Sequence, residues 1–364
     1  MGMSPTSRVL TGLSSLALAA AGFAATAAPA QADQPSSEFA GQTHPYRHGV
    51  VPTKEAGAAT AGKRTTNLNF GGGVDGIGVT TGAPKVYLVF WGSQWGTQGT
   101  DSNGYTTLSG DPSGIAVRAQ QLFKGLGTNN ETWSGVMTQY CQGITKGATS
   151  CPSTAAHVGY PTGGALAGVW VDPSAAAPGQ ATGNQIANEA IKAAGHFGNT
   201  TAAANRNVQY VVLSPTGTHP DGFNTSSGNF CAWHDWNGDS TLSGGAAASP
   251  YGDIAFTNDP YVTDMGTSCG QNYVNTGSAG LLDGVTMVYG HEYSETVTDQ
   301  NPAGGWTDSS GAENADKCAW KGTGGVGGAQ NVTFATGSFA MQGTWANDYN
   351  GGAGGCEISH PVVP

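Results

Sequence analysis

The chain has 364 residues, of which 24 are acidic and 13 are basic, so its formal net charge is −11 at pH 7. This acidic balance argues against nucleic acid as a partner. Charged residues make up only 10% of the chain while glycine contributes 59 residues. Such a composition excludes a helical bundle and is typical of a loop-rich extracellular protein.

The N-terminus is predicted to be a signal peptide over residues 1–32. Arg8 supplies the positive charge, Val9–Ala28 is apolar, and Ala30–Ala32 offers an A-x-A cleavage site. A transmembrane anchor is the alternative, but the small residues, the break at Pro29 and the lack of a second apolar span argue against it. We therefore expect a secreted, extracellular protein with no membrane anchor after cleavage.

Residues 33–73 are polar and rich in Pro, Gly, Ala and Thr, and are predicted to form a disordered leader or propeptide. Lys63-Arg64 is a weak candidate for a processing site within it. Its two histidines, His44 and His48, are expected to be exposed to solvent. The remainder, residues 74–364, is predicted to be a single secreted globular domain.

Strands and helices alternate in the first half of this domain. Buried strands are predicted at Pro84–Gly92 and Gln209–Leu213, and a short strand at Val169–Asp172. Helices are predicted at Pro112–Leu126 and Asn184–Phe197. Another helix is expected at about 283–298, ended by Asn301-Pro302. This order indicates an α+β or α/β fold with a single mixed sheet and flanking helices, and with a loop-rich, disulfide-stapled C-terminal half.

The six cysteines all follow the signal segment and predict three disulfides in an exported protein. Sequence alone cannot choose among the possible pairings. We favour sequence neighbours, which gives Cys141–Cys151, Cys231–Cys269 and Cys318–Cys356. A zinc–cysteine site is not expected, because the chain has no close Cys-x-x-Cys pair.

The most informative motif is His-Glu-x-x-Glu at residues 291–295. On a helix, His291 and Glu295 lie about one turn apart on one face. The pattern resembles the zincin His-Glu-x-x-His helix, with glutamate in place of the second histidine. Seven carboxylates and no Lys or Arg lie between Asp283 and Asp316, and a divalent metal would neutralise that charge. The alternative is a solvated helix face without a metal.

Glu313 is predicted to be the third metal ligand, as gluzincins take theirs from a glutamate on a second helix, with one position left for water. Asp316 is predicted to accept the other ring N–H of His291. Glu292 is predicted to be the general base that deprotonates the metal-activated water. Zinc is the first choice of metal. Manganese and calcium are alternatives, because carboxylate-rich sites suit harder ions.

Three further motifs are weaker. His234, which follows Cys231-Ala-Trp, is a candidate catalytic residue that stabilises an oxyanion, or a ligand, although a structural histidine beside a disulfide is the alternative. Asp235–Asp239 resembles the start of a calcium loop but has Ala246 where the twelfth-position glutamate belongs. Ser268 lies in a Gly-x-Ser-x-Gly sequence without the strand–turn–helix context of a nucleophile elbow.

Taken together, the motifs resemble the plant EXORDIUM / phosphate-induced protein 1 family and its bacterial secreted relatives. The matching blocks are Lys85–Gly92, Phe230–His234, Leu282–Glu295, Thr298–Pro302, Trp306, Glu313–Cys318 and Trp345–Cys356. The chain departs from the family by an extra residue pair before Pro302 and a shortened glycine-rich stretch after Cys318. The plant members are extracellular, cell-wall-associated proteins linked to growth. The resemblance therefore implies compartment and architecture rather than a reaction.

Two functions follow as hypotheses. The first is a secreted metal-dependent hydrolase, most simply a zinc metallopeptidase acting on peptides. The second is a non-catalytic extracellular protein of EXORDIUM type that binds cell-wall polymer or glycan and keeps a structural metal, with nine Trp and twelve Tyr available for sugar stacking. An open metal position beside Glu292 would favour the enzyme, and a closed site would favour the binding protein.

Overall fold

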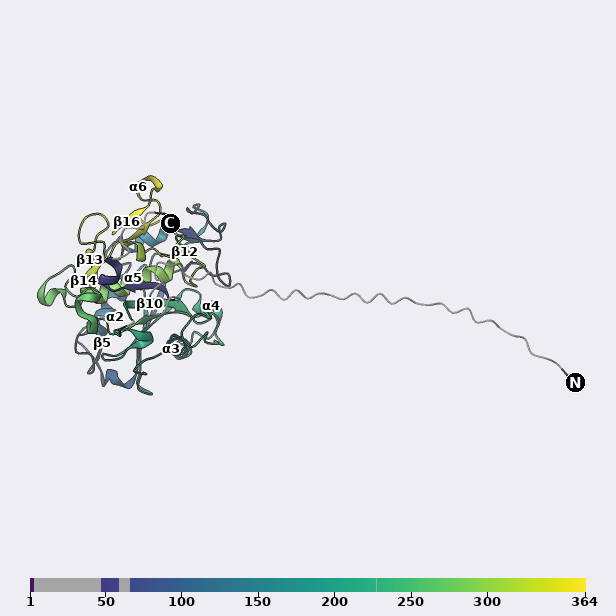
Figure 1. Cartoon of the computed structure of the whole chain (residues 1–364), viewed down its shortest axis with the longest axis horizontal. Coiled ribbons are helices and arrows are strands. Elements are labelled where there is room, and N and C mark those ends of the chain that lie inside the picture. Colours follow the sequence, from purple (N-terminus) through teal and green to yellow (C-terminus); the bar gives the residue numbers. More distant parts are fainter. Residues whose placement is uncertain (3–46, 59–65, 227) are drawn as a thin grey trace. The chain divides into compact units, whose positions relative to one another are not determined.

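The computed structural model describes residues 1–2, 47–58, 66–226 and 228–364 (Figure 1). Most of the predicted signal peptide, together with His44 and Lys63-Arg64, lies outside the described residues. The described chain from residue 47 onward belongs to one compact unit that spans Ala32–Pro364. Within the described ranges, no helix is both long enough and apolar enough to cross a bilayer.

A six-stranded mixed sheet forms the centre of this unit. Its strands, in spatial order, are β1 (His48–Pro52), β10 (Phe230–Trp236), β11 (Ala255–Asp259), β9 (Val208–Leu213), β3 (Lys85–Trp91) and β8 (Leu166–Asp172). The last four run parallel to one another. β10 is antiparallel to β11, and β1 pairs antiparallel with β10 at the edge of the sheet. The fold is therefore α+β with one mixed sheet at its centre.

Short elements surround the sheet. The small two-stranded sheets are β2 (Asn69–Phe70) with β12 (Trp306–Thr307), β4 (Gln98–Thr100) with β5 (Thr106–Leu108), β6 (Cys141–Gln142) with β7 (Ala156–His157), β13 (Gln330–Phe334) with β14 (Gly337–Met341), and β15 (Thr344–Ala346) with β16 (Gly355–Glu357). The helices are α1 (Lys54–Ala58), α2 (Ile115–Gly125), α3 (Gly183–His196), α4 (Ala202–Asn205), α5 (Asp283–Thr298) and α6 (Tyr349–Gly352).

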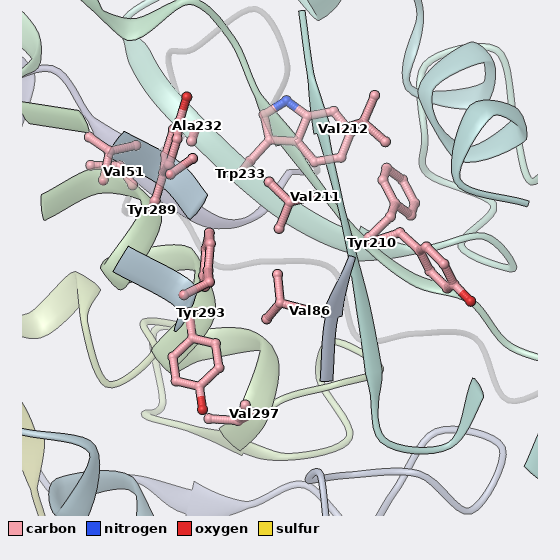
Figure 2. Close-up of a cluster of buried hydrophobic side chains, with 14 of the residues drawn as sticks. Val51, Val86, Tyr210, Val211, Val212, Ala232, Trp233, Tyr289, Tyr293 and Val297 are labelled. Atoms are coloured by element: carbon pink, nitrogen blue, oxygen red, sulfur yellow. The ribbon is translucent and has the colours of Figure 1, made fainter. Parts of the chain in front are cut away.

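Helices cover both faces of the sheet, as the side chains of β9 show. The Gln209 side chain donates to Thr296 Oγ1 of α5 at 2.9 Å, whereas the hydroxyl of the next residue, Tyr210, donates to Asn205 of α4 at 2.7 Å. Successive side chains of a strand point to opposite faces, so α5 and α4 lie on opposite sides. Figure 2 shows Val211 on the same side of the strand as the α5 residue Tyr293.

All sixteen residues of α5 are buried. The helix packs against β10, β11 and β1, with α2 and β14 on its other sides. Its first turn is held by Asp283, whose carboxylate accepts the backbone N–H groups of Val274 and Asn275 at 2.9 and 2.6 Å. A helix buried on every side is usually apolar all round. The polar residues of α5 are therefore held in place by something other than solvent.

The structure contains the three predicted disulfides, Cys141–Cys151, Cys231–Cys269 and Cys318–Cys356, and no cysteine of the described chain is free. The second joins the start of β10 to the 3₁₀ helix η5 (Val262–Cys269), and the third joins the 3₁₀ helix η7 (Asp316–Cys318) to β16. The first lies before residue 182, so disulfide stapling is not confined to the C-terminal half.

Part of the segment predicted to be disordered is ordered. Residues 48–58 form β1 and α1, and Val50 and Val51 are only 3% and 1% exposed. The prediction of solvent exposure for His48 is wrong, because its side chain is buried and its Nε2 lies 3.0 Å from Asp239 Oδ2. The polar residues on either side dominate the composition of this segment, so composition alone does not indicate the short strand within it. That strand gains its stability from pairing with β10.

Candidate metal centre

Six polar side chains meet between α5, β10 and the start of η7. Each is at most 1% exposed. They are His291, Glu292 and Glu295 from α5, His234 from β10, and Glu313 and Asp316 from the turn that leads into and begins η7. The fold thus brings together every residue for which the sequence predicts a metal-binding or catalytic role.

His291, Glu295 and Asp316 form a first group of donors. The Nε2 atom of His291 lies 3.0 Å from Glu295 Oε1 and 3.7 Å from Asp316 Oδ1, and the three donor atoms all lie within 4.8 Å of one another. Within the described chain, neither His291 Nε2 nor Asp316 Oδ1 has a hydrogen-bond partner of good geometry. Buried polar atoms without a partner are costly, and a cation between them would satisfy both.

His234, Glu295 and Glu313 form a second group. The Nε2 atom of His234 lies 3.2 Å from Glu313 Oε2 and 4.0 Å from Glu295 Oε2. Glu295 therefore belongs to both groups and contributes one oxygen to each. The predicted ligand set of His291, Glu295 and Glu313 is divided in the structure, because Asp316 rather than Glu313 lies with His291.

The other ring nitrogen of His291 faces Gln342, not Asp316 as predicted. Its Nδ1 lies 3.1 Å from Gln342 Oε1, and the amide of Gln342 donates in turn to the Ala315 carbonyl at 2.9 Å. A proton on Nδ1 leaves Nε2 with a free lone pair that points at the donor cluster. Gln342 follows β14 and carries no motif, so nothing in the sequence marked it.

Backbone groups hold the turn before η7 against α5. The backbone N–H of Asp316 donates to Glu295 Oε1 at 2.8 Å, and that of Glu313 donates to Asp316 Oδ2 at 3.1 Å. The Asn314 side chain donates to the Ser294 carbonyl at 3.2 Å. The predicted second helix is only the three-residue 3₁₀ helix η7. Hydrogen bonds to α5 replace the rigidity that a longer helix would supply.

Glu292 lies in the same cluster but belongs to neither group. Neither of its carboxylate oxygens has a hydrogen-bond partner of good geometry in the described chain. Burial raises its pKa well above the usual range, and the charges of Glu295, Asp259 and Asp316 act in the same direction, while the backbone N–H of Val51 opposes them. The carboxylate of Asp259, on β11, is also buried and unpaired.

The electrostatics of the cluster favour an added positive charge. Burial raises the pKa of Glu313 well above its ordinary value and that of Glu295 to about 7, and the neighbouring carboxylates add to both shifts. Burial lowers the pKa of His291, but Glu295 and Asp316 outweigh it and raise that pKa to about 10. Without a cation the cluster must therefore take up protons, and a bound dication removes that need.

The basic residue next to the cluster in sequence does not neutralise it. Lys317 follows Asp316, but its Nζ lies 2.7 Å from Asp308 Oδ2 and sits over the ring of Trp345, 4.4 Å from the ring centroid. In the described chain, every ion pair made by the six clustered side chains joins a carboxylate of the cluster to His234 or His291. Among the described residues, no Lys or Arg side chain pairs with the cluster, so His234 and His291 are its only cationic partners there.

The segment Asp235–Asp239, which resembles the start of a calcium loop, lies in a separate buried group of side chains. Asp239 accepts from His48 and from the backbone N–H of Thr241 at 2.6 Å, and Asp235 completes a buried group with these two side chains. A histidine of β1 thus lies with these two loop carboxylates.

Comparison of the chain with protein-family models, curated proteins and solved structures gives no match.

Proposed function

We propose that this protein is a secreted metal-dependent hydrolase whose divalent ion is held at Glu295. The observation that carries the proposal is the pair of donor groups that share this one carboxylate, with His291 Nε2, Asp316 Oδ1 and Glu295 Oε2 buried and lacking hydrogen bonds within the described chain. Two imidazoles and several carboxylates suit zinc, and the share of oxygen donors keeps manganese and calcium as alternatives.

The donors divide into those that hold the ion and those left free to react. His291, Glu295 and Asp316 supply one nitrogen and two oxygens, with Gln342 fixing the imidazole. A divalent ion held there would lower the pKa of water and polarise a carbonyl group. His234 and Glu313 lie on the other side of Glu295, where they can add ligands or hydrogen-bond a substrate oxygen.

Glu292 is suited to proton transfer. It follows His291 directly on α5, makes no ion pair with a basic residue of the described chain, and has a pKa raised by burial. A carboxylate whose pKa is raised is a stronger base than an ordinary one, so it can take a proton from water and return it to a leaving group. In this proposal Glu292 is the general base, and the substrate is a peptide bond in an extracellular polypeptide.

The second candidate is the non-catalytic wall-binding or glycan-binding protein of EXORDIUM type. The observation that favours it is the complete burial of the six side chains, which is typical of a structural metal. The sequence blocks that resemble the EXORDIUM family support this candidate as much as they support the enzyme. Both candidates fit an oxidising extracellular compartment, which the three disulfides favour.

One experiment separates the two candidates. The secreted chain is purified, its metal content is determined by mass spectrometry, and hydrolysis of a broad peptide library is measured before and after chelation. We expect bound metal and a hydrolysis that chelator abolishes and zinc restores. Bound metal without hydrolysis of any peptide, under conditions in which the centre is accessible, would support the binding protein instead.

A further inference from the structure

Strand β1 lies directly across the candidate metal centre. His48 pairs with His234 of β10 in the sheet register, and the register shifts between His48 and Val51. Gly49 lies in this irregular stretch with φ +48°, and a Cβ atom there would lie 2.0 Å from His234 Cδ2 and 2.6 Å from Glu295 Oε2. Only a glycine can bring the backbone this close to the centre.

The strand also faces the proposed base. Val51 pairs with Ala232 of β10, and Figure 2 shows both beside Tyr289 of α5. The backbone N–H of Val51 opposes the rise in the pKa of Glu292, although neither carboxylate oxygen has a hydrogen-bond partner of good geometry in the described chain. The backbone at Gly49 thus lies against His234 and Glu295, where the proposed mechanism requires a substrate to approach the metal.

Side-chain anchors hold the strand at both ends. Arg47 forms a buried ion pair with Asp221 and lies over the ring of Phe230, 4.2 Å from its centroid. At the other end, Trp320 Nε1 donates to the Pro52 carbonyl at 2.7 Å. These anchors contact the rest of the fold away from the metal donors, so the strand is bound by contacts that do not depend on the metal.

We propose that residues 47–58 are an inhibitory plug, which occupies the substrate position of the metal centre and must leave before a polypeptide can reach it. This inference rests on the proposed function and supplies its regulation. In the described part of the chain, β1 is an edge strand that pairs with β10 alone, so its departure leaves the rest of the sheet intact and exposes the backbone of β10. An extended polypeptide can then pair with β10 in its place.

The test loosens the plug without touching a metal donor. Arg47→Gln removes the buried ion pair, and Gly49→Val adds a side chain for which the docked strand has no room. Arg118→Gln is the matched control, because Arg118 also stacks on a phenylalanine, Phe339, at 4.0 Å and donates to a backbone carbonyl, but from α2. Docking is followed by hydrogen exchange of residues 48–53.

The first readout is the rate at which zinc-loaded protein loses its metal to a chelator. We expect Arg47→Gln and Gly49→Val to speed both hydrogen exchange and metal loss at least ~10-fold, because a broken buried ion pair is strongly destabilising, and Arg118→Gln to leave both unchanged. Fast exchange of residues 48–53 with unchanged metal loss would overturn the proposal. So would a strand that stays docked in both variants, because it would then be an integral part of the fold.

The second readout adds the plug back in trans. A synthetic peptide of residues 47–58 should slow metal loss from the Arg47→Gln variant and inhibit any peptide hydrolysis, while the same peptide carrying Gly49→Val should do neither. Equal effects of the two peptides would overturn the assignment of Gly49. If the native peptide protects the metal but no variant hydrolyses any peptide, the plug stands and the hydrolase proposal fails.

Discussion

The side-chain amide of Gln342 lies 3.1 Å from Nδ1 of His291 and fixes which ring nitrogen faces the donor cluster. The amide is itself oriented by the Ala315 carbonyl, in the same turn that carries Asp316. One hydrogen-bonded chain therefore links β14, α5 and η7 around the imidazole. The orientation of His291 depends on a residue about fifty positions away in sequence.

Gln342→Leu should weaken metal binding by about 10–100-fold, the usual cost of removing a partner that orients a ligating histidine. Gln342→Glu keeps an acceptor at Nδ1 and should bind metal more tightly than Gln342→Leu. Affinity is measured by competition with a chromophoric chelator. Gln120→Leu, at another buried glutamine, is the control for loss of a buried amide. Equal affinity of wild type and Gln342→Leu would contradict the orienting role.

His291→Ala should abolish stoichiometric metal, since it removes the nitrogen donor of the first group. Glu295→Gln should weaken binding, because it replaces a charged ligand shared by both groups with a neutral one. Metal content after gel filtration, determined by mass spectrometry, checks both variants, and circular dichroism shows whether each has folded. One metal ion per folded chain in His291→Ala would remove this histidine from the site.

Glu292→Gln should retain metal and fold but lose hydrolysis by ~10²–10⁴-fold, the usual contribution of a positioned base. The amide is nearly isosteric with the carboxyl group and cannot take a proton from water. The variant is assayed in the Arg47→Gln background. There the plug should no longer block the metal centre, so that a loss of hydrolysis can be measured. Full activity there would leave the metal in place and rule out Glu292 as the base.

Removing the Cys318–Cys356 bridge by a double alanine substitution should cost on the order of 2–5 kcal/mol in the free energy of unfolding. Denaturant titration of the oxidised protein measures this value, and thiol titration of the denatured, unreduced wild type should find no free cysteine. A reactive thiol in the wild type would contradict the pairing seen in the structure.

Stability should fall between about pH 4.5 and 8 because of Glu189. Burial raises the pKa of this α3 carboxyl from 4.5 to about 8, with a further contribution from Asp172, while Lys192 acts in the opposite direction. A raised carboxyl pKa means that the folded protein holds the proton more tightly than the unfolded chain. The stabilisation is thus full below pH 4.5 and lost as the pH rises through 8.

Glu189→Gln should remove this loss of stability with rising pH. At pH 9 the variant should be more stable than the wild type by on the order of a few kcal/mol, and at pH 4 the two should be alike. Urea unfolding at both pH values measures the difference. A wild type that is as stable as the variant at pH 9 would show that Lys192 compensates the buried charge.

The sequence predicted the elements whose patterns are strong. α5 has the expected bounds, because the His-Glu-x-x-Glu spacing and the Asn301-Pro302 stop are local signals. The division of donors between two groups was not predictable, because it depends on how the turn before η7 hydrogen-bonds to Glu295. Gln342 carries no local signal at all. Likewise β1 is five residues long, and only its pairing with β10 makes it a strand.

Two disulfides stand beside the donors that come from outside α5. Cys231 lies three residues before His234, and Cys318 lies two residues after Asp316. Reduction would release β10 from η5 and η7 from β16, and the backbones that carry His234 and Asp316 would lose these covalent links. If the proposed metal is bound, an order of maturation follows: the two bridges should form before the metal is loaded, and the same chain with reduced cysteines should hold the donors less firmly.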